Sequence, residues 1–169
     1  PFVRYWLHCK HLLVNGEKMS KSKGNYYALR DLLKKGYDPM AIRYALISVH
    51  YRQPLNFTLE GLKESGELIQ RLDDCYWQCL NQLGGDQELK RTAGEKKEAN
   101  LSSLLPAFLE KMANALSEDL NISQALAHLT DAVTHINLRL SRVSLAAEEA
   151  KSALEFFRQV DRLLGFDII

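Results

Sequence analysis

Residues 12–25 read L-L-V-N-G-E-K-M-S-K-S-K-G-N, a short apolar run followed by a turn and a loop crowded with lysine and serine. The pair Asn15-Gly16 in this stretch is the strongest hairpin signal in the chain. Both central positions of a type I′ turn need positive φ, which Asn and Gly tolerate. We therefore predict a β-hairpin with arms at 11–14 and 17–20.

The loop that follows the hairpin alternates ammonium and hydroxyl side chains. Lysine-rich loops are most often only solvated, but three features favour a binding role here. Donors of both kinds converge on one side of an extended segment, Gly16 and Gly24 provide hinges, and a hairpin and a predicted helix hold the two ends. Such donors suit a polyphosphate, with lysine as a point charge. The loop is not of the Walker type, because no G-x-x-x-x-G-K-[ST] occurs.

Charge is distributed unevenly along the 169 residues. Between residues 1 and 36, eight basic side chains face two acidic ones, whereas acids outnumber bases from residue 61 onward. This asymmetry points to an anionic ligand near the start of the chain. No stretch is long and apolar enough to span a membrane, no signal-like segment opens the chain, and three cysteines fit no disulfide framework. We therefore expect a cytoplasmic protein without a membrane partner.

Elsewhere the apolar spacing is mostly helical. A further strand is predicted at 2–8, and the segment 50–57, broken by Pro54, is predicted to be an irregular connector. The fold class is therefore mainly α: a short β-hairpin and loop, followed by an antiparallel helical bundle with short connections. Helices are predicted over 27–35, 38–49, 58–84, 101–120, 123–140 and 146–164.

The loop and its flanks resemble a known family. K-M-S-K-S at 18–22 matches the signature loop of class I aminoacyl-tRNA synthetases letter for letter, while Lys23 stands where most members carry Leu. The flanking runs Y-W-L-H, D-P-M-A-I-R-Y-A-L and H-Y-R-Q-P-L-N-F-T narrow the resemblance to the cysteinyl-tRNA synthetases. The run D-L-N at 119–121 and the following Q-A-L-A resemble that family too, so the resemblance covers nearly the whole chain.

This resemblance implies an organisation and a reaction. Residues 1–37 would be the tail of a class I Rossmann-type catalytic domain with its signature loop, and 38–84 would be stem-contact helices. Residues 85–100 would be a flexible linker, and 101–169 a helical bundle that binds tRNA. The family activates cysteine with ATP and Mg²⁺ and transfers it to tRNA(Cys).

The resemblance also assigns roles to single residues. Charge builds on the departing pyrophosphate, and a mobile cationic loop that closes at that moment binds the transition state better than it binds ATP. Lys21 would be the principal ATP-contacting lysine, while Lys18, Ser20 and Ser22 would orient the loop or donate to phosphate oxygens. Candidate contacts to tRNA or to the active site are Trp6, His8, Arg52 and Asn56.

Other parts of the family's active site are not found in this sequence. No H-x-G-H motif occurs, and the family's zinc needs ligands from upstream segments, so Zn²⁺ is expected only in the full-length protein and no metal ligand is assigned. Cys75 and Cys79 lie on one face of a predicted helix, as core cysteines commonly do. We therefore predict that the fragment alone does not charge tRNA.

Two alternative functions stay open from the sequence. A related ligase that joins cysteine to an amino-sugar in mycothiol synthesis shares the loop and the helix after it. A non-catalytic helical module that binds tRNA or a protein partner would merely retain the loop. An upstream reading frame with zinc ligands and an H-x-G-H motif would exclude this module.

Overall fold

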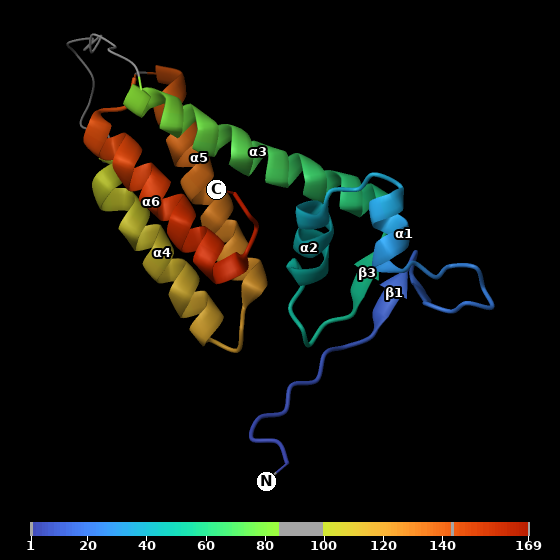
Figure 1. Cartoon of the computed structure of the whole chain (residues 1–169). Coiled ribbons are helices and arrows are strands. Elements are labelled where there is room, and N and C mark those ends of the chain that lie inside the picture. The colour runs from blue at the N-terminus through green and yellow to red at the C-terminus, as the bar shows by residue number, and fades with distance from the viewer. Residues whose placement is uncertain (1, 85–99, 143, 169) are drawn as a thin grey trace. The chain divides into compact units, whose positions relative to one another are not determined.

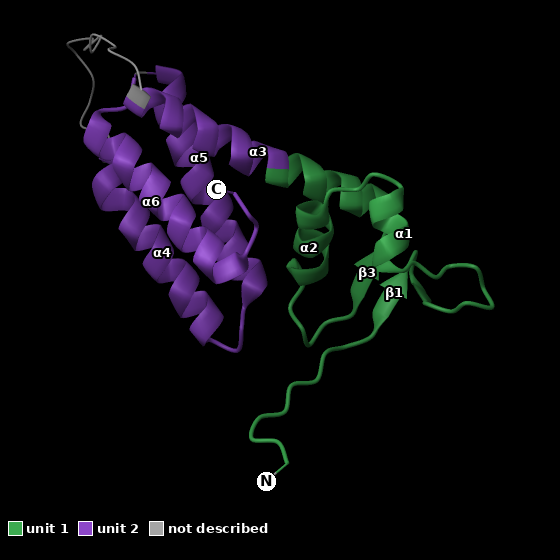
Figure 2. Cartoon of the chain, viewed as in Figure 1, with its two compact units in different colours: residues 1–69 green, residues 70–169 purple. Residues whose placement is uncertain are grey.

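The structure is a computed structural model that describes residues 2–84, 100–142 and 144–168 (Figure 1). It contains two compact units, residues 1–69 and residues 70–169 (Figure 2). Helices account for most of the described residues, which confirms the mainly-α prediction. The elements are β1 (Leu12–Val14), β2 (Glu17–Lys18), α1 (Leu29–Lys34), α2 (Pro39–Ile47), β3 (Leu55–Phe57), α3 (Leu59–Gly84), α4 (Leu101–Ser117), α5 (Ile122–Arg142) and α6 (Ala147–Leu164).

A three-stranded sheet in the order β2-β1-β3 organises the first unit. Strand β1 pairs antiparallel with β2, with Val14 opposite Glu17, which confirms the predicted hairpin. Asn15 and Gly16 have φ of 51° and 78°, as a type I′ turn requires. The second arm is shorter than predicted, because β2 ends at Lys18.

Strand β3 corrects the prediction of an irregular connector at 50–57. It pairs parallel with β1, with Leu12 opposite Leu55 and Val14 opposite Phe57. Pro54 does not prevent this strand, because it lies just before it, where its missing N–H removes no ladder bond. Three residues are too few to show the alternation of a half-buried strand, so the local sequence gives no signal for β3.

The predicted strand at 2–8 is wrong. The residues from Phe2 to Lys10 are exposed and form no strand, although a bond of 2.9 Å from the Lys10 amide to the Tyr51 carbonyl ties the end of the segment to the first unit. A strand needs a neighbour, and the sheet of the described residues consists of β2, β1 and β3. The aromatic residues at 2–8 match strand propensity, but no strand in the described part of the chain pairs with their backbone.

Helices α1 and α2 and the start of α3 cover this sheet with one apolar cluster. The predicted roles of Asp38 at the start of α2 and of Gly36 after the end of α1 are confirmed. Asp38 Oδ1 accepts from the Met40 amide (3.0 Å), and the Tyr37 amide donates to Leu32 O (3.2 Å) beyond Gly36, whose φ is 83°. Helix α1 begins two residues later than predicted, because Tyr27 packs against the cluster ahead of the first turn. The buried members are Val14, Leu32, Ala41, Ile42, Ala45, Phe57 and Leu62.

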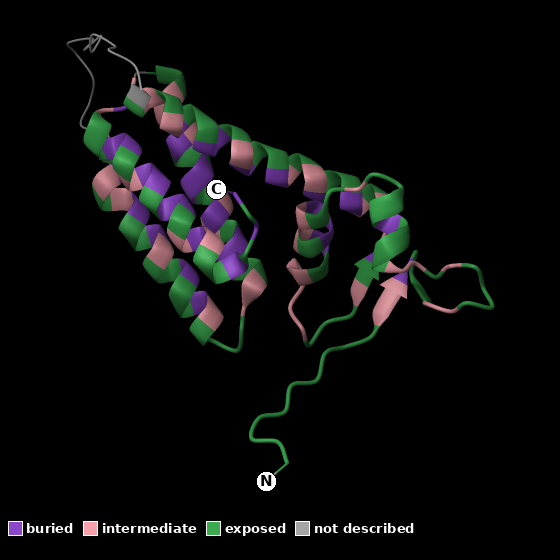
Figure 3. Ribbon diagram, viewed as in Figure 1, coloured by how far each residue is buried: buried purple, intermediate pink, exposed green. Residues whose placement is uncertain are grey.

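The second unit is a helical bundle, as predicted. Figure 1 shows α4 and α6 running in one direction and α5 in the other, and Figure 3 shows their buried residues turned towards one another. Phe156, Phe157 and Met112 are fully buried at its centre. Helix α4 ends at Ser117, three residues before the predicted end, because the chain turns through positive φ at residues 119 and 120.

One buried carboxylate joins three helices of this bundle. Glu149 is 5% exposed, and its side chain accepts from the backbone amides of Leu101 (3.4 Å) and Ala146 (3.3 Å). The guanidinium of Arg139 lies 3.4 Å from it. These contacts connect the start of α4, the start of α6 and the last turn of α5. Asn100, which caps α4, ends the predicted 85–100 linker; the rest of that linker lies outside the described residues.

Candidate functional site

The charged loop leaves the sheet at Lys18 and returns to the helical layer at Leu29. In Figure 1 it projects from the first unit beyond β1 and α1. Lys18, Lys21 and Lys23 are exposed, whereas Met19 packs against the apolar cluster beneath the sheet. Side chains alternate across an extended segment, so anchoring Met19 turns its two neighbours towards solvent.

The neck of the loop, where residues 18–20 approach residue 25, is closed by the side chain of Asn25. Asn25 Oδ1 accepts from the Ser20 amide at 2.8 Å, and Asn25 Nδ2 donates to Lys18 O at 3.3 Å. The outgoing segment 18–20 is thereby tied to the returning segment. The sequence reasoning overlooked Asn25; its position directly after the glycine hinge was the available signal, since Asn side chains bond to nearby backbone groups in turns.

The tip of the loop is a tight turn over residues 21–24. The Gly24 amide donates to Lys21 O at 3.2 Å, and Gly24 has φ of 70°, which a residue with a Cβ rarely adopts. The hydroxyl oxygens of Ser20 and Ser22 lie 2.8 Å apart, within hydrogen-bonding distance. Lys18, Lys21 and the two serines therefore lie within one short segment whose backbone is fixed at both ends.

The ammonium groups of Lys21 and Lys23 each contact another side chain. Lys21 Nζ lies 5.2 Å from the ring centroid of Tyr26, a cation–π contact. Lys23 Nζ forms an ion pair with Glu17 Oε2 at 2.9 Å, and this hydrogen bond holds the pKa of Glu17 below its ordinary value. Both partners of that pair are largely exposed, and exposed pairs contribute little to stability.

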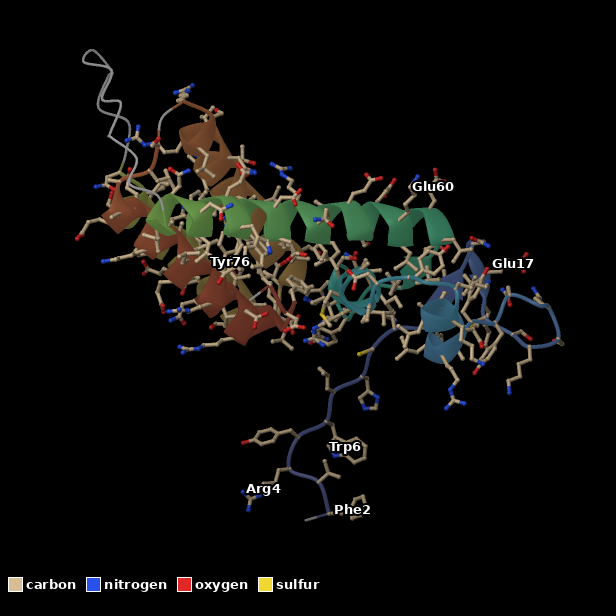
Figure 4. All side chains as sticks on the ribbon, turned by 45° about the horizontal axis from the view of Figure 1, so that its top comes forward. Phe2, Arg4, Trp6, Glu17, Glu60 and Tyr76 are labelled. Carbon is tan, nitrogen blue, oxygen red and sulfur yellow. The ribbon has the colours of Figure 1, made fainter. Side chains whose placement is uncertain are left out.

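The structure places the other predicted contact residues outside the loop. Trp6 and His8 stack on each other with ring centroids 6.1 Å apart on the exposed N-terminal segment, and Figure 4 shows Trp6 well separated from Glu17. Arg52 lies over the ring of Tyr51, 5.0 Å from its centroid. Asn56 also lies outside the loop, in β3, but it contacts the hinge of the loop, since its Oδ1 accepts from the Gly16 amide at 2.7 Å.

A cavity of about 350 Å³ lies behind β3, between the end of α2 and the start of α3. Its serine hydroxyls are engaged by neighbouring carbonyls: Ser48 Oγ donates to Ala45 O (3.0 Å) and Ser65 Oγ to Gly61 O (2.7 Å). No charged side chain lines it. The loop is therefore the better candidate site for an anionic ligand.

Zinc does not fit the residues at hand. Among the described residues no group of three His, Cys, Asp or Glu side chains is arranged to hold a metal ion. Cys75 and Cys79 are fully buried in α3, and their mutual hydrogen bond together with burial raises the pKa of Cys75. Buried cysteines one helical turn apart are ordinary core residues, and two ligands do not make up the four-ligand set of a structural zinc site. Within the same described residues, no helix combines the length and apolar character that a bilayer span needs.

Comparison with known proteins matches both units. The family described as the class I tRNA synthetase (C) catalytic domain matches residues 1–67, and the DALR domain family matches residues 111–168. The first match includes the whole charged loop. The second lies entirely within the helical bundle.

Curated relatives cover nearly all of the chain. A cysteine–tRNA ligase from Brachyspira hyodysenteriae is 42% identical over 164 residues, which is 97% of this chain and 33% of the relative. The enzyme of that name from Chlamydia muridarum is 40% identical over 98% of the chain and 35% of its own length. One from Leptospira interrogans is 37% identical over 97% and 34%. The chain thus spans about a third of the length of these relatives, and it belongs to the cysteinyl-tRNA synthetase family of class I aminoacyl-tRNA synthetases.

Proposed function

We propose that the natural protein containing this chain activates cysteine with ATP and Mg²⁺ and transfers it to tRNA(Cys). In this proposal the charged loop stabilises the departing pyrophosphate, and the helical region contacts the tRNA. The observation that carries the proposal is the loop itself, in which Lys18, Lys21 and two serine hydroxyls extend from a backbone closed by Asn25. The names of the curated relatives support the choice of cysteine and tRNA.

The loop chemistry follows from where charge develops. When the α-phosphorus bond to the pyrophosphate breaks, negative charge accumulates on the leaving oxygens. Lys21 is available for them because it rests on the exposed ring of Tyr26, a contact worth about 0.5–1 kcal/mol in solvent. A desolvated, charge-assisted bond to phosphate is stronger, so the ammonium group would move to the phosphate as the loop closes.

The serines and Lys18 complete the set of donors. The hydroxyls of Ser20 and Ser22 are already paired with each other, so each keeps a defined direction until phosphate oxygens replace that bond. Lys18 adds a second ammonium group at the neck. One preorganised donor of this kind is worth on the order of 3 kcal/mol of activation free energy.

The remaining assignments belong to the same proposal. Arg52 and Asn56 would contact tRNA phosphates or 2′-hydroxyls, largely independently of sequence. Trp6 and His8 are exposed and would face the rest of the active site. Zinc would be bound by residues of the natural protein other than those described here. A cytoplasmic location stays a prediction.

The proposed reaction is tested by ATP–pyrophosphate exchange with the natural protein. We expect exchange that depends on cysteine, followed by charging of tRNA(Cys), and no stimulation by an amino-sugar acceptor. The chain of 169 residues alone is expected to catalyse neither step. Cysteine transfer to an amino-sugar instead of tRNA would establish the mycothiol-type ligase. No cysteine-dependent exchange would leave a non-catalytic module.

A further inference from the structure

We propose that Asn25 is a positioning residue of the loop, whose side-chain amide fixes the neck so that Lys21 and the two serines are held ready for phosphate. This inference rests on the proposed function, since it concerns the geometry of the same donors. It names a residue that would act through the backbone and not by touching the substrate.

The argument begins with the pair of bonds at the neck. The Asn25 carboxamide accepts from the Ser20 amide (2.8 Å) and donates to Lys18 O (3.3 Å), so it contacts two backbone groups on either side of Met19. A carboxamide carries an acceptor oxygen and a donor NH₂ group on the same carbon, so one Asn side chain can satisfy both backbone groups at once. Alanine offers neither group, and aspartate would place a negative oxygen against the Lys18 carbonyl.

We call the two Asn25 hydrogen bonds the clamp. Met19 supports the clamp from the opposite side. Its side chain packs on the apolar cluster, while Asn25 holds the backbone before and after it. Residues 18–20 therefore cannot rotate about the strand axis without losing either the apolar contact or the two hydrogen bonds. Because this rotation would redirect Lys18 and Ser20 together, the clamp sets the direction of both side chains.

The clamp also determines the position of the tip. Once the neck is closed, the remaining turn over 21–24 is short and is bonded internally from the Gly24 amide to Lys21 O. Ser22 is held to Ser20 by the 2.8 Å hydroxyl contact, so it follows the neck. Fixing the neck thus reduces the reorganisation needed when charge develops, which is the property that makes donors catalytic.

The ion pair between Glu17 and Lys23 crosses the same loop but does not replace the clamp. Its side chains are 61% and 57% exposed, and such pairs are easily exchanged for water. Glu17→Gln therefore provides a matched control: it removes a cross-loop contact and leaves both Asn25 bonds in place. We expect this variant to keep the activity of the natural protein.

The test uses the natural protein with Asn25→Ala and Glu17→Gln. Amide hydrogen exchange, followed by mass spectrometry of overlapping peptides within 17–26 whose ends bracket residue 20, isolates the Ser20 amide. We expect Asn25→Ala to exchange there at least tenfold faster, and Glu17→Gln to match the wild type. In ATP–pyrophosphate exchange, kcat of Asn25→Ala should fall at least tenfold with KM for ATP changed less than twofold, at a temperature where the wild type and both variants are fully folded.

Two results would overturn the inference: unchanged exchange at Ser20 in Asn25→Ala, or unchanged kcat, with or without a fall in Tm. The second would make Asn25 a purely structural residue. Failure of the proposed function is distinct, because the wild-type protein would then show no cysteine-dependent pyrophosphate exchange. In that case, hydrogen exchange at Ser20 would by itself test whether the Asn25 side chain holds the neck.

Discussion

The amide of Gly16 donates a hydrogen bond of 2.7 Å to the side chain of Asn56, a residue 40 positions later in the chain. The neighbouring Asn15 amide donates to Phe57 O at 3.1 Å. The hairpin turn is therefore held by β3 as well as by its own two strands. Because the charged loop starts from this hairpin, β3 supports the candidate site although it lies outside the loop.

The first prediction concerns this link. Asn56→Ala removes the acceptor of the Gly16 amide, and the exposed amide then bonds to water, so we expect a loss of about 1 kcal/mol in unfolding free energy. Urea denaturation measures it. Gln53→Ala, at an exposed position of the same connector, is the control and should change little. Equal midpoints for both variants would show that the bond does not stabilise the turn.

The second prediction compares two glycines with opposite expected signs. Gly16 has φ of 78°, so Gly16→Ala should destabilise by about 1 kcal/mol through backbone strain, although open space surrounds the site. Gly66 lies within α3, where an added Cβ would meet the Ala41 Cβ at 3.7 Å, an ordinary contact. Gly66→Ala should therefore stabilise by about 0.5–1 kcal/mol. Thermal unfolding measures both, and a neutral or stabilising shift in Gly16→Ala would contradict the assignment of strain to Gly16.

The third prediction concerns the carboxylate that joins the helices of the bundle. Glu149→Ala leaves the Leu101 and Ala146 amides without this acceptor and removes one ion-pair partner of Arg139, so we expect a loss of about 3 kcal/mol. Glu149→Gln keeps one acceptor oxygen and should lose less. Its exposed neighbour gives the control, Glu148→Ala. A denaturation midpoint of Glu149→Ala that is no lower than that of Glu148→Ala would show that Glu149 does not stabilise the bundle.

The fourth prediction is the titration of Glu17. Lys23 holds the pKa of Glu17 below its ordinary value of 4.5. A folded pKa below the unfolded one means that the ion pair favours the folded state above the unfolded pKa. That contribution disappears as pH falls through the lowered pKa. NMR titration of the Glu17 carboxyl carbon should show a midpoint below 4.5 that rises in Lys23→Met. An identical midpoint in both proteins would exclude the pair in solution.

Local signals were sufficient to predict much of the fold. Asn15-Gly16 predicted the hairpin, Asp38-Pro39 predicted the start of α2, and Gly165, with φ of 62°, marks the end of α6 as expected. Each of these residues determines its own backbone conformation, so a single sequence is enough.

The missed features depend on partners distant in the chain or on a side chain bonding to backbone. Strand β3 exists because β1 lies beside it, and the aromatic run at 2–8 forms no strand because no described strand pairs with it. Glu149 contacts the start of α4, 48 residues earlier, so its role is not visible in the pattern of α6. In the site, the K-M-S-K-S run predicted candidate phosphate donors, which stay a prediction, whereas the hydrogen bonds of Asn25 that close the loop required coordinates.

The most direct test of the account is the rate of adenylate formation in the natural protein carrying Lys21→Ala, measured by ATP–pyrophosphate exchange against Lys34→Ala, an exposed lysine at the end of α1. The account predicts that Lys21→Ala lowers kcat on the order of 100-fold, equivalent to about 3 kcal/mol, with ATP binding nearly unchanged, and that Lys34→Ala behaves as wild type. Wild-type turnover in Lys21→Ala would contradict it.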